Sequence, residues 1–192
     1  MHRRTAVCFL ALLGLAYAPA RAARSGEIPV GGRLPDVLMR GLNGPARRLS
    51  EYRGRPLIIN VWASWCGPCM EEMSSLERLA WLDDRMPFSM IGVSTDDDVE
   101  AARAVLRRNR ATLRHFIDHD LELETLLGAR TIPLTVLVDA DGRVVDKIDG
   151  SRQWDSPESL RLIARAFRLG RTPGAAAGTR TGLPANANSG PQ

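Results

Sequence analysis

Two cysteines separated by two residues, Cys66 and Cys69, stand where a β-rich apolar run ends and a helical periodicity begins. We therefore expect them in the first turn of a helix, where unpaired backbone N–H groups and the positive end of the helix dipole favour a thiolate. The second sulfur lies nearly one turn further on, within disulfide reach of the first. This spacing predicts a redox pair in which Cys66 is the nucleophile that forms a mixed disulfide and Cys69 resolves it.

A cysteine pair of this spacing also occurs in metal and haem sites. A zinc site would combine the pair with His115 and His119, which have a metal-ligand spacing but lie far along the chain. Covalent haem attachment requires a histidine directly after the second cysteine, where this chain has Met70. We therefore expect no bound metal and no cofactor, and we expect the histidines at the surface or at strand ends.

The first 22 residues have the pattern of an export signal. Two arginines precede an apolar stretch at 5–18, and small residues at 20 and 22 fit a cleavage site. The apolar stretch is shorter than the roughly 20 residues that span a bilayer, so an uncleaved membrane anchor is the less favoured alternative. Because Cys8 would leave with the signal, the exported chain would keep only the redox pair, in a compartment that allows disulfides.

The charge pattern argues against a nucleic-acid partner. The whole chain of 192 residues has a formal net charge of +4. Residues 23–170, however, hold 21 basic and 22 acidic side chains, so the positive excess lies at the two ends. A nucleic-acid-binding domain needs a basic face on its folded part, which this balance does not supply. The length suits one domain with a hydrophobic core.

Hydrophobic periodicity predicts strands and helices in alternation, followed by an antiparallel hairpin and a closing helix. An Asn-Gly pair at 43–44 indicates an earlier hairpin within 35–49, and an Ala-Asp-Gly turn at 140–142 joins the last two strands. This order implies a mixed central sheet with helices on both faces. The predicted strands span about 57–62, 88–95, 115–118, 134–139 and 143–148, and the predicted helices about 66–86, 98–110, 120–128 and 157–169.

Capping residues predict the helix ends. The aspartates at 96–98 are expected to cap the second helix, Asp120 the third, and Ser156 with Pro157 the last. Gly128 is the expected C-terminal stop of the third helix, because glycine adopts the left-handed conformation that often ends a helix.

The ten residues from Asn60 to Cys69, Asn-Val-Trp-Ala-Ser-Trp-Cys-Gly-Pro-Cys, resemble the active-site strand and helix of the thioredoxin superfamily. They most resemble the periplasmic branch typified by TlpA and ResA, and the similarity extends over roughly residues 31–165. The resemblance implies a thioredoxin-like three-layer α/β/α sandwich with a mixed central sheet, an N-terminal β-hairpin extension and an inserted strand and helix. The expected segments are a signal peptide at 1–22, an irregular lead-in at 23–34, the thioredoxin-like domain at 35–170 and a disordered tail at 171–192.

Two positions near the motif favour this branch. Thioredoxin has a buried aspartate where this chain has Asn60, whereas the branch tends to have a glutamate three residues after its second cysteine, here Glu72. That spacing puts Glu72 on the same side of the helix as Cys69, where a carboxylate can take or return a thiol proton. The resemblance implies that Glu72 is this proton relay. The alternative is a solvated glutamate that favours the helix dipole, as at Glu71.

The Thr-Ile-Pro run at 131–133, just before a predicted hairpin, resembles the cis-proline loop of the superfamily. The resemblance implies a cis bond before Pro133 and a loop that faces the disulfide and offers backbone groups to an extended substrate. The alternative is a trans proline that starts an edge strand. The expected substrate-contacting residues are Trp65, Gly67, Pro68, Ile132 and Pro133.

The resemblance implies a periplasmic protein-disulfide reductase that acts as a monomer. Its substrates would be disulfide-containing exported proteins, such as apocytochrome c or copper-site assembly factors, and a membrane thiol-reductant donor would restore its dithiol. Gly-Pro between the cysteines is the dipeptide of reducing members. Trp154, which precedes the last predicted helix, either packs that helix onto the sheet or contacts a partner.

Two other functions remain open. A peroxiredoxin-type thiol peroxidase shares the fold, but its Pro and Thr arrangement ahead of a lone cysteine is absent before Cys66. A Sco-like copper-delivery protein uses a wider cysteine spacing and a distant histidine, so His115 or His119 would have to complete the copper site.

Overall fold

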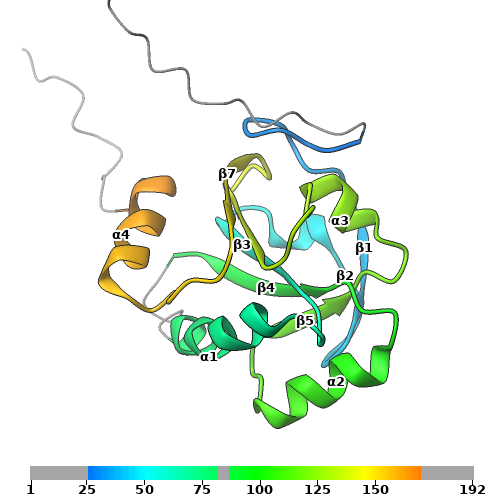
Figure 1. The fold of residues 1–192 in the computed structure, drawn as a ribbon. Helices are drawn as coiled ribbons and strands as arrows, with labels where there is room; N and C mark the ends of the chain where they lie inside the picture. Colours follow the sequence, from blue (N-terminus) through cyan, green and yellow to red (C-terminus); the bar gives the residue numbers. More distant parts are fainter. Residues whose placement is uncertain (1–25, 82–86, 170–192) are drawn as a thin grey trace, which may run out of the picture.

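The computed structural model describes residues 26–81 and 87–169, which fold around a mixed seven-stranded sheet (Figure 1). The strand order is β2-β1-β5-β4-β3-β6-β7. The strands are β1 Leu38–Gly41, β2 Arg47–Arg48, β3 Leu57–Trp62, β4 Ser89–Ser94, β5 Arg114–Ile117, β6 Leu134–Val138 and β7 Val144–Asp149. The helices are the 3-10 helix η1 Leu49–Tyr52 and the α-helices α1 Gly67–Trp81, α2 Val99–Arg108, α3 Glu122–Leu127 and α4 Pro157–Ala166.

Strand β3 lies at the centre of the sheet and is buried along its whole length. It runs parallel to β4 and antiparallel to β6, so the carboxyl ends of β3 and β4 meet the start of β6 at one edge. Val61 pairs with Leu134, and Trp62 pairs with Ser94. The residues that follow β3 therefore emerge between the exit of β4 and the entry of β6.

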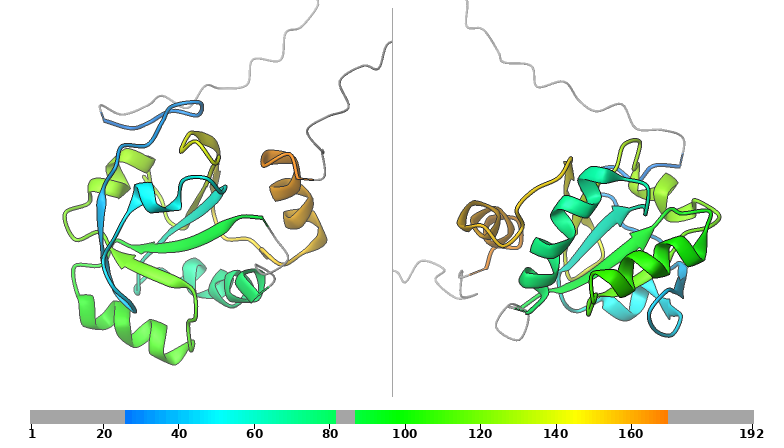
Figure 2. Two further views of the ribbon diagram at one scale, coloured as in Figure 1. Left: turned by 180° about the vertical axis from the view of Figure 1, so that it is seen from behind. Right: turned by 60° about the horizontal axis from the view of Figure 1, so that its bottom comes forward.

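The alternation of side chains along β3 separates two apolar layers. Ile59 belongs to the layer that contains Leu127 of α3. Trp62, on the opposite face, packs in a layer with residues of α1 and α2, and Ile58 packs with residues of α1 and α4, including Ile163. Helices α1, α2 and α4 thus cover one face of the sheet, and η1 and α3 cover the other (Figure 2). The predicted three-layer α/β/α sandwich is confirmed.

The N-terminal hairpin and the inserted strand and helix pack against each other at one side of the sheet. β1 pairs antiparallel with β2 across the predicted Asn-Gly turn, and its other edge pairs with β5. Asn43 of this turn joins the two, because its side chain donates to the Leu113 carbonyl (2.7 Å) and accepts from the His115 backbone N–H (2.9 Å). The hairpin extension and the insertion are therefore both present.

The predicted helix caps are correct at two of three helices. Asp98 accepts hydrogen bonds from the first backbone N–H groups of α2, and Ser156 caps α4. The prediction for Asp120 is wrong, because the carboxylate of Asp118 accepts from the N–H groups of Leu123 (3.1 Å) and Glu124 (2.7 Å) instead. The capping aspartate thus lies just after β5, two residues before the predicted one, and its side chain reaches the start of α3. Helix α4 also ends three residues before the predicted end.

Several expectations fall outside the described residues. The predicted signal peptide at 1–22 and the predicted tail at 171–192 are among these. Residues 26–34 of the predicted lead-in form no helix or strand, although Arg33 makes an isolated bridge to Arg143. Within the part of the chain that the structure describes, no helix has both the length and the apolar character needed to cross a bilayer.

The effect of a leucine-to-alanine substitution on stability should depend strongly on whether the leucine lies in the buried core or at the surface. Leu137 on β6 is fully buried, whereas Leu38 on β1 is 58% exposed. We predict that Leu137→Ala lowers the free energy of unfolding by about 2–5 kcal/mol, because it removes buried apolar surface and leaves a cavity. The matched variant Leu38→Ala is expected to change it by less than about 0.5 kcal/mol. Equal losses in denaturant titrations of the two variants would contradict this assignment of the core.

A candidate redox site at the start of helix α1

The two cysteines lie at the junction between β3 and α1 and are joined by a disulfide, with their Cα atoms 5.3 Å apart. Cys66 precedes the first helical residue, and its carbonyl accepts from the Met70 N–H (3.2 Å). The Cys69 backbone N–H points at the Cys66 sulfur at 3.2 Å, as expected for a sulfur held at the N-terminus of a helix. Cys66 is 5% exposed and Cys69 1%, so the first cysteine is the more exposed of the two.

The loop before β6 forms the opposite wall of the site. The bond between Ile132 and Pro133 is cis, which confirms that prediction. The Ile132 carbonyl oxygen lies 3.7 Å from the Cys66 sulfur. Gly67 and Pro68 are exposed, and Trp65 is exposed over 71% of its surface. All five residues expected to contact substrate therefore lie within three positions of Cys66 in sequence or on the loop that faces it.

A carboxylate from outside the cysteine motif, that of Asp96, holds the turn that carries Cys66. The Cys66 N–H donates to the Ala63 carbonyl (3.1 Å) and closes a turn over residues 63–66. Within this turn, the Ser64 N–H and hydroxyl both donate to the buried carboxylate of Asp96. The sequence interpretation missed this role and took the aspartates at 96–98 only as a helix cap. The signal was present, because one aspartate suffices for a cap and the first of the three directly follows the strand predicted at 88–95.

Glu72 lies on the buried face of α1 and is 2% exposed, which contradicts the alternative of a solvated first-turn glutamate. Three groups donate hydrogen bonds to its carboxylate: the Asn60 amide (2.7 Å), the Trp154 indole N–H (2.9 Å) and the Arg152 backbone N–H (3.0 Å). Asn60 also donates to the Thr135 hydroxyl on β6 (3.1 Å). The carboxylate is thus bound from β3 and from the segment before α4.

Burial raises the pKa of Glu72 above its ordinary value of 4.5, because the ionised form loses its hydration. The hydrogen bonds from Trp154, Asn60 and Arg152 favour the ionised form and oppose this shift without cancelling it. No hydrogen bond joins Glu72 to either cysteine within the described residues, so a proton would pass between them only through motion or an intervening group.

Trp154 packs inside the protein, so of its two predicted roles the structure supports packing. Its side chain is fully buried in the apolar layer that contains Leu76 of α1 and Ile163 of α4. Its backbone N–H donates to the Ser75 hydroxyl (3.0 Å), which in turn donates to the Glu72 carbonyl (2.7 Å). The segment before α4 is thereby fastened to α1, and the indole is unavailable to a partner.

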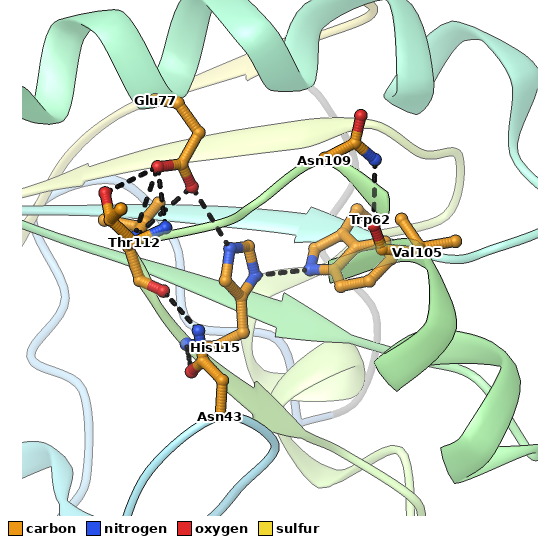
Figure 3. A network of polar contacts seen from close by, with 8 residues as sticks. Asn43, Trp62, Glu77, Val105, Asn109, Thr112 and His115 are labelled. Atoms are coloured by element: carbon orange, nitrogen blue, oxygen red, sulfur yellow. Dashed lines mark hydrogen bonds and ion pairs between the residues drawn. The ribbon is translucent and has the colours of Figure 1, made fainter. Parts of the chain in front are cut away.

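His115 is buried within β5, so the expectation of a surface or strand-end histidine is wrong for this residue (Figure 3). The Trp62 indole N–H donates to its Nδ1 (3.1 Å), and its Nε2 lies 3.9 Å from a Glu77 carboxylate oxygen. Burial lowers the pKa of the imidazole, although Glu77 opposes this shift. Gly92 on β4 makes room for the ring, which a Cβ at that position would meet. The histidine is thus turned to Trp62 and Glu77, not to the cysteines as the zinc and copper hypotheses require.

Comparisons with known proteins agree with this geometry. The model of the Redoxin family matches residues 29–161. The thiol-disulfide oxidoreductase ResA of Geobacillus thermodenitrificans is 27% identical over 150 residues, which cover 77% of this chain and 86% of that protein. A structure from Chlorobium tepidum, described as a thiol:disulfide interchange protein DsbE, superposes with a TM-score of 0.67 at 24% identity over 73% of this chain and 99% of that one. A structure from Bacteroides thetaiotaomicron, described as a protein disulfide isomerase, has a TM-score of 0.59 at 27% identity over 72% of this chain and 87% of that one.

The hydrogen bond from Trp154 to Glu72 predicts a pH-dependent loss of stability. Because the folded-state pKa of Glu72 is raised, stability falls as pH rises from 4.5 through that pKa and Glu72 ionises in the buried site. Trp154→Phe removes one donor to the ionised form, so we predict a loss of about 1–3 kcal/mol near neutral pH and a smaller loss below pH 4.5. Denaturant titrations at several pH values measure this. Trp81→Phe, at an exposed tryptophan, is the control, and a loss for Trp154→Phe that is the same at every pH would contradict the assignment.

Proposed function

This chain belongs to the Redoxin family, and from that membership we propose that it reduces disulfides of exported proteins by dithiol–disulfide exchange. It is a thiol–disulfide oxidoreductase of the ResA-like kind. The observation that carries the proposal is the Cys66–Cys69 pair at the first turn of α1, facing the cis-proline loop.

In the proposed cycle, the reduced protein brings two electrons to the substrate. The Cys66 thiolate attacks one sulfur of a substrate disulfide, so that a mixed disulfide forms and the other substrate sulfur leaves as a thiolate. Cys69 then loses its proton and attacks the Cys66 sulfur. The Cys66–Cys69 bond forms, the bond to the substrate breaks, and the substrate leaves as a dithiol. Cys69 suits this second step because it is the less exposed of the two cysteines, at 1% against 5% for Cys66.

The loop before β6 is the proposed binding edge for an extended substrate segment. The Ile132 carbonyl is directed toward the Cys66 sulfur, and Pro133 cannot donate a hydrogen bond, so the backbone groups next to it are the available ones. Trp65, Gly67 and Pro68 form the exposed rim on the other side of the sulfur. A segment between these two walls would place its disulfide in line with Cys66.

Glu72 is the proposed acceptor of the Cys69 proton. Its burial raises its pKa toward the operating pH, which is the condition for an efficient general base. It lies three residues after Cys69 on the buried face of α1, and its hydrogen bonds to Asn60 and Trp154 hold the carboxylate in place. The Asn60 amide donates to the Glu72 carboxylate and to the Thr135 hydroxyl. The first of these bonds would support the ionised form of Glu72, which accepts the proton.

The proposed setting is the periplasm. The signal-like pattern in residues 1–22 supports export, and an uncleaved anchor remains the alternative. The protein would act as a monomer. A membrane thiol donor would supply the electrons that keep Cys66 and Cys69 reduced in an oxidising compartment. Apocytochrome c and copper-site assembly factors are the proposed substrates, because both must present reduced cysteine pairs to bind their groups. The Gly-Pro dipeptide between the cysteines supports reduction as the direction.

The cycle predicts different outcomes for the two cysteines. We predict that Cys66→Ser abolishes disulfide reduction, because no thiolate remains to attack the substrate. Cys69→Ser should instead accumulate a mixed disulfide with the substrate, because the resolving thiol is gone. Turnover assays with a disulfide-bonded peptide, followed by mass spectrometry without reductant, measure both. Full turnover in the Cys66→Ser variant would overturn the mechanism.

The role of Glu72 predicts a shifted pH profile. Glu72 accepts a proton only when ionised, so the wild-type resolving rate should fall as pH drops through its raised pKa. In Glu72→Gln this base is absent, and we predict that the half-maximal rate moves to higher pH with about a tenfold or greater loss near neutrality. Stopped-flow measurement of mixed-disulfide resolution checks this. Glu71→Gln, at the neighbouring exposed glutamate, is the matched control, and equal profiles for the two variants would refute the relay.

A further inference from the structure

Asp96 is a buried carboxylate that the proposed cycle does not use. It lies two residues after the end of β4 and is 2% exposed. The Ser64 hydroxyl donates to Oδ1 at 2.6 Å and the Ser94 hydroxyl to Oδ2 at 2.7 Å, while the Ser64 N–H lies 3.0 and 2.9 Å from the two oxygens. Hydroxyl bonds of this length are typical of an ionised acceptor. In each of these contacts a hydroxyl or a backbone N–H donates to an oxygen of the Asp96 carboxylate.

The charge of Asp96 is not balanced by a cation. Within residues 26–81 and 87–169, no arginine, lysine or histidine forms an ion pair with it, and hydroxyl and amide dipoles are its only partners. It differs in this from the carboxylate of Glu27, which pairs with Arg130 next to the cis-proline loop. The negative charge is therefore retained at the turn that it binds.

That turn carries the nucleophile. Ser64 is two residues before Cys66, and the Cys66 N–H closes the turn on the Ala63 carbonyl at 3.1 Å. The carboxylates on the other packed elements are engaged elsewhere: Glu72 of α1 with Asn60 and Trp154, and Asp118 after β5 with the start of α3. Among the described residues, Asp96 is thus the one carboxylate bonded to the turn of Cys66.

We propose that Asp96 is a positioning residue that fixes the turn before Cys66 and, through its charge, disfavours the Cys66 thiolate. This inference rests on the proposed reductive function and explains how the direction is set. A low cysteine pKa stabilises the reduced, thiolate form of the pair and so makes its disulfide a strong oxidant. A fixed negative charge beside the turn acts in the opposite sense and offsets part of the effect of the helix N-terminus. The dithiol then gives up its two electrons and forms the Cys66–Cys69 bond more readily.

The test removes the charge and keeps the shape of the side chain. In the otherwise unchanged protein, Asp96→Asn is expected to lower the pKa of Cys66 by about half a unit to one unit, as a nearby charge in a partly screened site does. The equilibrium constant for oxidation of the dithiol by glutathione disulfide should fall about three- to tenfold, by the same free energy. Alkylation rates against pH measure the first quantity, and quenched redox equilibria measure the second.

The matched control is Asp97→Asn, which removes an exposed charge one residue away and should shift the pKa of Cys66 by less than a third as much. Ser64→Ala is the second variant, because it keeps the charge and removes one hydroxyl dipole that screens it. The pKa of Cys66 in this variant should rise, opposite to its fall in Asp96→Asn. If Asp96→Asn fails to fold, this rise decides the matter, and an unchanged or lower pKa of Cys66 in Ser64→Ala overturns the proposal.

An unchanged or raised Cys66 pKa in a folded Asp96→Asn protein would also overturn it. Neither measurement uses a protein substrate, so a failure here is distinct from a failure of the proposed reductase activity, which the substrate-trapping variant tests. If the two substitutions only loosened the turn, activity would fall, but the pKa of Cys66 would not move in opposite directions in Asp96→Asn and Ser64→Ala.

Discussion

The turn between β3 and α1 is the constraint on which the rest of the structure depends, because it must hold two sulfurs in one helical turn and leave Cys66 the more exposed of the two cysteines. The hydrogen bond from the Cys66 N–H to the Ala63 carbonyl closes this turn. Since β3 is parallel to β4 and antiparallel to β6, the exit of one neighbour and the entry of the other lie beside it. Asp96 holds the turn from the side of β4, and the loop before Pro133 faces the Cys66 sulfur from the side of β6.

The sequence predicts those features of the site that are local to one segment. The strand and the helix on either side of Cys66 follow from periodicity, and the reach between the two cysteines follows from helix geometry. The cis bond before Pro133 and the place of Glu72 on the inner face of α1 came from the resemblance rather than from the residues alone. Local patterns sufficed where the relevant partners lie within about one helical turn of each other.

Long-range partners could not be predicted in this way. The donors to Glu72 include Trp154, more than 80 positions away, and only the packing of α4 against α1 brings the indole to the carboxylate. Spacing alone favours a solvated Glu72 over a proton relay. His115 and Asp96 illustrate the same limit, since a buried ring beside Gly92 and a carboxylate turned to the neighbouring strand depend on which strands are adjacent. A run of aspartates does not reveal which of them turns inward.

The central claim is that Cys66 and Cys69 form a reducing couple, and its reduction potential tests this most directly. The protein would be equilibrated at pH 7 in glutathione or dithiothreitol buffers, and the fractions of dithiol and disulfide would be trapped and counted by mass spectrometry. A reducing couple should have a potential more negative than about −200 mV, toward the value of about −270 mV found for thioredoxin. A potential near about −120 mV, as in the strong oxidant DsbA, would contradict it.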